Sequence, residues 1–238
     1  MPLPASARPA RPRILPTWLN GRRVLRAVLI AMMLPTALIL IYRFVPPPGT
    51  LLMLARMVEG EGLDKSWQPL EEISPRLAQA VIASEDNRFC EHFGFDWQEI
   101  SGQIDRALAG GSARGASTIT QQSAKNVLLW PGRDPLRKVL EAALTPQLDL
   151  FWGKRRIMEV YLNVAETGPG LYGAEAAARH YFGRPAKDLT RRQAALIAAV
   201  LPNPRVWSPA KPTAYIRRRA DVIERRIGQL GPLLDCVG

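Results

Sequence analysis

The chain has 238 residues, of which 47% are hydrophobic, and a formal net charge of +11 at pH 7. This length and composition are those of a globular protein with one main domain plus appendages, and its two cysteines are too few for a disulfide framework. The charge argues against a nucleic-acid binder, because residues 1–43 hold seven arginines and no acid, which leaves 25 basic (32 minus 7) against 21 acidic residues elsewhere.

The N-terminal segment combines this basic excess with an apolar stretch. Residues 1–23 are rich in proline and arginine and predict a disordered basic tail. Sixteen uncharged residues, 27–42, lie between two arginines and predict a transmembrane helix over 24–45, with the tail in the cytoplasm and the remainder outside. A cleaved signal peptide is the alternative, but no small-x-small cleavage site is evident before the proline run at 46–48.

Residues 46–70 predict a linker, and residues 71–238 the main domain. Apolar periodicity and capping residues predict helices over 74–84, 96–109, 117–129, 134–151, 154–164, 171–182, 190–201 and 213–230. We expect Pro146 to kink the fourth of them. Almost no strand signal and no repeat is found, so the domain is predicted to be mostly α.

The two cysteines, Cys90 and Cys236, allow one disulfide in an oxidising compartment. A structural zinc site is disfavoured, because the chain has only two histidines and no second cysteine pair.

A pair of acids, Glu85 and Asp86, follows an apolar helix. A carboxylate among apolar side chains has its charged form disfavoured, which suits a general acid or base. The alternative is that both residues simply end the helix.

A glycine-rich segment, 110–115, leads into a helix with few apolar residues. On a period of 3.6, Thr118, Gln121, Gln122 and Lys125 share one side of it. Such a face is usually solvated, but a helix start with a lysine two turns in is also suited to phosphate, since backbone N–H groups and a full charge face the anion. The Walker pattern GxxxxGK[ST] is absent.

A cluster of cations, Arg133, Arg137 and Lys138, lies close to Glu141 on the next helix. Surface ion pairs at helical spacing, worth under about 0.5 kcal/mol, are one interpretation. The other is a cationic pocket for a polyanion, steered by one acid.

Four ordered motifs connect these features. They are EDxxFxxHxGxD at 85–96, GxSTITQQxxKN at 115–126, RKxxE at 137–141 and KxxIxExYLN at 154–163. Together they closely resemble the family-51 glycosyltransferases, the peptidoglycan polymerases, and more narrowly the monofunctional members. The resemblance covers residues 70–207 and the predicted anchor.

The resemblance implies a mostly α, lysozyme-like fold with a large lobe and a smaller membrane-contacting lobe. It implies two substrates, a lipid-diphosphate-linked glycan as donor and lipid II as acceptor, and a catalytic domain in the periplasm at the bacterial inner membrane. Other cell-wall synthesis or division proteins are candidate partners. No required cofactor is implied, with Mg²⁺ or Mn²⁺ as an optional aid to the diphosphate.

Residue roles follow from the same resemblance. Glu85 would take the proton of the acceptor 4-OH, and Glu141 would lie near the leaving diphosphate. Substrate or diphosphate would be bound by Ser117, Thr118, Gln121, Gln122, Lys125, Asn126, Arg133, Arg137 and Lys138. Structural roles within the motifs fall to Asp86, Phe89, His92, Asp96, Glu159, Tyr161 and Asn163. No residue is predicted as a metal ligand.

Two rival functions remain. A lytic enzyme of the same fold class would need a general acid and often a second carboxylate, but not a cationic set around a diphosphate. A membrane-bound scaffold would need no particular glutamate at 85 or 141.

Ser208 and Lys211 match SxxK, but no KTG follows in the 27 remaining residues, so we expect no transpeptidase. Residues 127–130 are expected either to dip into lipid or to pack in the core.

Overall fold

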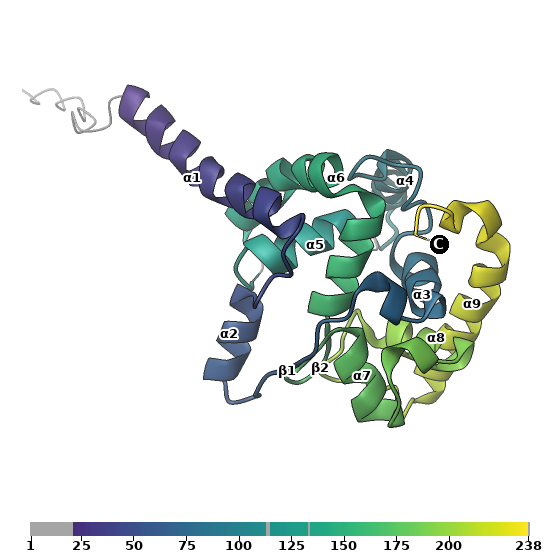
Figure 1. Cartoon of the computed structure of the whole chain (residues 1–238). Helices are drawn as coiled ribbons and strands as arrows, with labels where there is room; N and C mark the ends of the chain where they lie inside the picture. Colours follow the sequence, from purple (N-terminus) through teal and green to yellow (C-terminus); the bar gives the residue numbers. More distant parts are fainter. Residues whose placement is uncertain (1–20, 113–114, 133, 238) are drawn as a thin grey trace, which may run out of the picture.

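The computed structural model describes residues 21–112, 115–132 and 134–237. These residues are mostly helical, as predicted (Figure 1). The α-helices are α1 (Gly21–Tyr42), α2 (Leu51–Val58), α3 (Pro75–Glu85), α4 (Trp97–Leu108), α5 (Ile119–Leu128), α6 (Pro135–Val164), α7 (Gly173–Phe182), α8 (Arg191–Val200) and α9 (Ala214–Leu230). Short 3₁₀ segments are η1 (Leu70–Glu72), η2 (Ala186–Asp188) and η3 (Gly231–Leu234).

Side-chain caps explain where several helices begin. Asp96 accepts a hydrogen bond from the Glu99 backbone N–H (2.9 Å), and Thr190 forms the predicted capping box ahead of α8. Ser74 precedes α3 as predicted, but its hydroxyl donates to the carbonyl of Leu189 (3.2 Å) instead of capping the helix. Helix starts are therefore largely readable from the sequence because a cap involves only neighbouring residues.

Three helices, α3, α8 and α9, pack against one another along one side of the molecule (Figure 1). The seven residues Ala194–Val200 of α8 are all buried, so this helix lies inside the core. In contrast, α9 buries one face only, through residues spaced three or four apart: Ile216, Ala220, Ile223, Ile227 and Leu230. The basic side chains of α9 therefore lie on its other faces.

The longest helix, α6, contains one break, in the gap between the helices predicted over 134–151 and 154–164. Pro146 lies within the helix, whereas Gly153 has φ 68° and ψ 167°, outside helical values. A positive φ of this kind is readily adopted only by glycine. The backbone of α6 leaves helical values at Gly153 and not at Pro146, and the two predicted helices on either side of Gly153 are present.

A small sheet was not predicted. Its strands are β1 (Asp64–Lys65), β2 (Glu166–Gly168) and β3 (Leu171–Tyr172), in the order β1-β3-β2, with β1 parallel and β2 antiparallel to β3. Strands of two or three residues show no period in a sequence. Residues 46–70, predicted as a linker, thus contain α2 and a strand of this sheet, and α7 begins at Gly173 because the two preceding residues are in β3.

The first helix, α1, projects away from the body of the molecule (Figure 1). Its end is fixed to α6, since the Trp152 indole donates to the carbonyl of Ile39 (2.6 Å) and the Arg156 guanidinium to that of Tyr42 (2.9 Å). It overlaps the predicted membrane helix, but no helix formed by the described residues is long and apolar enough to cross a membrane. Most of the predicted tail, residues 1–20, lies outside the described residues.

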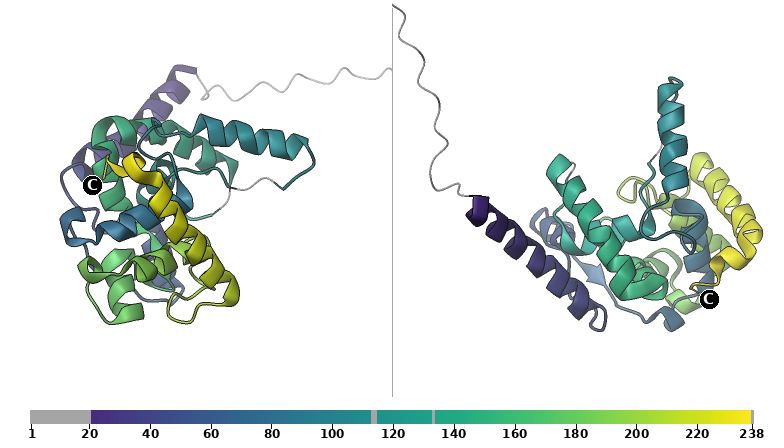
Figure 2. Two further views of the ribbon diagram at one scale, coloured as in Figure 1. Left: turned by 90° about the vertical axis from the view of Figure 1, so that its right-hand side faces the viewer. Right: turned by 90° about the horizontal axis from the view of Figure 1, so that it is seen from above.

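The fourth helix, α4, also extends from the body (Figure 2). Most of its side chains are exposed, and only Gln103 is buried. Residues 127–130, at the end of α5, are different: Val127 and Leu129 are buried, and Trp130 is 36% exposed. Core packing therefore accounts for the first and third residues of that stretch.

Candidate active site

Glu85, the predicted base, is the last residue of α3, and its side chain is 13% exposed. Its carboxylate accepts hydrogen bonds from the Gln122 amide (3.1 Å) and from the Ser84 hydroxyl (3.0 Å). The Arg219 guanidinium of α9 lies 3.7 Å away. The fold therefore joins the first motif to the second.

Gln122 is itself oriented by Tyr161, whose hydroxyl donates to its side-chain oxygen (3.2 Å). Burial, together with the charges of Glu85 and Asp86, raises the pKa of Tyr161 well above its usual value. The phenol therefore stays protonated and remains a donor. Because the oxygen of Gln122 accepts from Tyr161, its NH₂ group is directed to Glu85.

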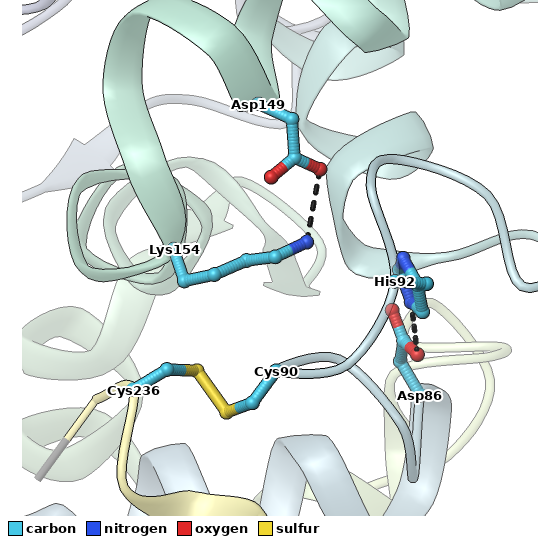
Figure 3. Close-up of a disulfide and its surroundings, with 6 residues drawn as sticks. All are labelled: Asp86, Cys90, His92, Asp149, Lys154 and Cys236. Carbon is cyan, nitrogen blue, oxygen red and sulfur yellow. Dashed lines mark hydrogen bonds and ion pairs between the residues drawn. A yellow bond between two sulfur atoms is a disulfide. The ribbon is translucent and has the colours of Figure 1, made fainter.

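Asp86 connects the first motif to the start of α5. One carboxylate oxygen lies 2.9 Å from Nε2 of His92 (Figure 3), and the other accepts from the Ile119 backbone N–H (3.0 Å). A carboxylate at a helix N-terminus satisfies a free N–H group and interacts favourably with the helix dipole. Asp86 and His92 thus set the position of α5 relative to Glu85.

The cationic cluster is built around a buried carboxylate. The Glu141 side chain is 3% exposed and accepts from the guanidinium of Arg137 (2.9 Å), whose side chain is 9% exposed, while the ammonium of Lys138 also contacts it. Lys138 is half exposed and donates to the Ser117 hydroxyl (3.2 Å). The cluster is therefore not a set of surface ion pairs, the alternative considered from the sequence.

Lys125 interacts electrostatically with both acidic residues of the site, Glu85 and Glu141. Burial lowers the pKa of Lys125, and the charges of Arg137 and Lys138 lower it further, whereas Glu141 and Glu85 raise it. In the part of the chain that the structure describes, its ammonium has no hydrogen-bond or ion-pair partner. A half-buried cation of this kind is available to an anionic ligand.

Other predicted residues have different positions. Thr118 and Gln121 are buried and form a capping box with each other, and Thr118 also donates to the Gly94 carbonyl (2.6 Å). Asn126 is half-buried on α5, and Arg133 lies outside the described residues.

The predicted structural residues form local contacts. Phe89 is fully buried, Glu159 pairs with Arg156 (2.6 Å), and Asn163 exchanges hydrogen bonds of 2.8 Å with the Gln68 backbone. Burial raises the pKa of Glu159. The hydrogen bonds of Asn163 hold α6 against the segment before α3.

Comparison with known proteins identifies the group to which the chain is similar. A family model described as Transglycosylase matches residues 53–227. The family's curated members include a biosynthetic peptidoglycan transglycosylase of Rhodospirillum centenum, 56% identical over 86% of this chain and 90% of that protein. A protein of the same description from Caulobacter vibrioides is 49% identical over 91% of this chain and 97% of its own length. The chain belongs to the transglycosylase family.

In this transglycosylase, sequence reasoning missed one contact with the predicted base. Arg219 lies on α9, far from the motifs in the sequence. In the structure it donates to the Ser84 hydroxyl (3.3 Å) and lies 3.7 Å from the carboxylate of Glu85. The only signal was the basic character of the last predicted helix, which does not single out one arginine.

The sequence analysis also missed a group of contacts between α5 and α6 of this transglycosylase. Asp149 accepts from the ammonium of Lys154 (2.9 Å; Figure 3) and from the Thr120 hydroxyl (3.2 Å). The same ammonium lies 4.8 Å from the ring centroid of Phe89. This group ties the first, second and fourth motifs together.

The donor set does not fit a metal held by the protein. Among residues 21–112, 115–132 and 134–237, no three His, Cys, Asp or Glu side chains are grouped so as to hold an ion. The two carboxylates at the site, Glu85 and Glu141, already accept from amide, guanidinium or ammonium donors. A metal ion would need free carboxylate or other oxygen ligands, but the side chains that surround these two carboxylates are mainly cationic.

Proposed function

We propose that this transglycosylase polymerises peptidoglycan glycan strands, transferring a lipid-diphosphate-linked glycan to lipid II. The names of its relatives support the substrate class. The observation that carries the proposal is the placement of a carboxylate, Glu85, and a cationic group, Lys125 with Arg137 and Lys138, around one helix, α5. A base and an anion clamp are the two functions that displacement of a diphosphate requires.

Glu85 acts as the general base. It takes the proton of the acceptor GlcNAc 4-OH while that oxygen bonds to C1 of the donor MurNAc. The bond from C1 to the diphosphate oxygen breaks, and the configuration at C1 inverts. Hydrogen bonds from Gln122 and Ser84 orient the carboxylate for this step.

The cations act on the leaving group. Lys125 and the half-exposed Lys138 contact the diphosphate, while Arg137 and Glu141 hold Lys138 and the surrounding helix in place. A diphosphate is a good leaving group once its charge is balanced, so no nucleophilic residue is needed. We include Gln122 and Ser117 among the contacts to substrate, and Asn126 and Arg133 remain predictions. We do not propose substrate contacts for Thr118 and Gln121, because both side chains are used in the capping box of α5.

No step is assigned to a metal ion, because the carboxylates already have partners. The clamp consists of the chain's own cations. We also propose that the mostly α fold is the two-lobed, lysozyme-like one.

We propose that the chain is held in the inner membrane by one N-terminal helix, with the tail in the cytoplasm and the catalytic domain in the periplasm. The arginines flanking residues 27–42 support this orientation. A disulfide joins Cys90 and Cys236, and such bonds persist in oxidising compartments. Extraction of membranes with alkaline carbonate tests the anchor, and release of the chain into the supernatant would contradict it.

The central experiment incubates the purified full chain in detergent with labelled lipid II and separates the products on a gel. Glu85→Gln is compared with Glu72→Gln, which removes an exposed acid far from the site. We expect polymer from the wild type and Glu72→Gln, and none from Glu85→Gln. Polymer from Glu85→Gln would remove Glu85 as base. An inactive but folded wild type would overturn the polymerase, and cleavage of preformed glycan would then favour the lytic rival.

A further inference from the structure

The C-terminal segment of the chain touches the region around Glu85 at three points. Arg226 donates to the Ala83 carbonyl (3.4 Å), Arg219 lies against Ser84 and Glu85, and Cys236 is bonded to Cys90. All three contacts fall on residues 83–90, the end of α3 and the loop after it. The disulfide is the covalent cross-link between this loop and the C-terminal segment.

One cysteine of the disulfide, Cys90, lies within the first motif (Figure 3). Cys90 follows Asp86 by four residues and precedes His92 by two, and the two Cα atoms of the disulfide are 5.6 Å apart. Asp86 and His92 are the pair that holds the loop to the start of α5. Cys90 lies between Asp86 and His92 in the sequence, so the disulfide restrains the loop between the two residues of this pair.

The ion pair of Arg219 acts on the carboxylate itself. The guanidinium is 3.7 Å from one oxygen of Glu85 and 3.3 Å from the hydroxyl of Ser84, which donates to the same oxygen. Both side chains are largely shielded, being 29% and 13% exposed. The guanidinium therefore contacts both Glu85 and the Ser84 hydroxyl that donates to it, which limits the positions that the carboxylate can take.

We propose that Arg219 and the disulfide Cys90–Cys236 make the segment 214–237 a brace that positions Glu85. This inference rests on the proposed function and adds positioning residues to it. The disulfide fixes the end of α9 and η3 against the loop, and the fixed helix holds Arg219 on the carboxylate. Small displacements of a reacting group cost large factors in rate, so the brace acts on turnover rather than on substrate binding.

The first test replaces Arg219 in the full chain and measures kcat and KM for the polymerisation of lipid II. For Arg219→Gln we expect kcat to fall about tenfold with KM for lipid II within about twofold of wild type. Arg219→Lys keeps a cation at this position and should restore most of the rate.

The matched control is Arg218→Gln, the same change at an exposed position on the same helix. It should keep kcat within about twofold of wild type. Arg219→Gln with the wild-type kcat would overturn the brace. So would an equal loss in Arg218→Gln, which would indicate a general effect of charge.

The second test opens the disulfide with a phosphine reductant and repeats the assay. We expect kcat to fall at least about threefold, and to recover on reoxidation. Cys90→Ser combined with Cys236→Ser should show the same loss and no response to the phosphine, which controls for effects of the reagent. Full activity of the reduced chain, with two free thiols counted, would overturn the role of the disulfide.

Thermal melts accompany both tests. If the melts show that the reduced chain unfolds, the reduction test is uninformative. The assay of Arg219→Gln then decides the proposal, because that variant keeps the disulfide. Absence of polymer from the oxidised wild type would overturn the proposed function and the inference with it, whereas unchanged variants beside an active wild type would overturn the brace alone.

Discussion

Asp86 offers a direct test of how the first motif is held to α5. Its side chain is 2% exposed and accepts from His92 and from the Ile119 backbone N–H. Asp86→Asn keeps the shape but removes the charge. The amide has one acceptor oxygen, which can meet the Ile119 N–H, and its NH₂ group then faces the nitrogen of His92 unless the imidazole changes tautomer.

The expected loss follows from these two contacts. A hydrogen bond to a charged group contributes about 1.5–3 kcal/mol. A negative charge at a partly buried helix N-terminus adds up to about 2 kcal/mol. The two effects share one carboxylate and do not add fully, so we expect Asp86→Asn to lower the free energy of unfolding by about 3 kcal/mol.

Thermal unfolding in detergent measures this loss. For a domain of this size about 3 kcal/mol corresponds to a fall in Tm of roughly 6–12 °C. Asp105→Asn, the same change at an exposed site on α4, is the control and should shift Tm by less than about 2 °C. If Asp86→Asn melted within about 2 °C of wild type, the assignment of Asp86 as the link between the motif and α5 would be refuted.

Two further predictions concern Lys125 and Gly153. Because the pKa of Lys125 is lowered from 10.5, its charge is lost at lower pH than that of an ordinary lysine, and the alkaline limb of kcat/KM should lie below that value. Lys125→Arg stays charged and should move this limb to higher pH; an unmoved limb would exclude Lys125 as its origin. Gly153→Ala should cost about 1–3 kcal/mol in a urea melt, because φ is 68° there although a Cβ would meet no atom within 4 Å. Gly102→Ala, inside α4 and equally open, should instead be neutral or stabilising, and an equal loss in both variants would contradict the backbone explanation.

Much of the helical framework was predictable because it depends on neighbouring residues. The capping box of Thr190 and the apolar face of α9 are visible in short windows of sequence. The break in α6 was predicted as the gap between helices 134–151 and 154–164, but the sequence did not show that Gly153 is the residue that leaves helical geometry.

The sequence alone predicted the reacting groups. Glu85 and the cations at 125, 137 and 138 stand in motifs whose residue types indicate the proposed chemistry. Tertiary structure decided how these groups are held. The contact of Gln122 with Glu85 spans 37 residues, that of Arg219 with Ser84 135, and the disulfide 146. Such pairs share no local period or cap. Their meeting depends on how α3, α5, α6 and α9 pack, which is a property of the whole core.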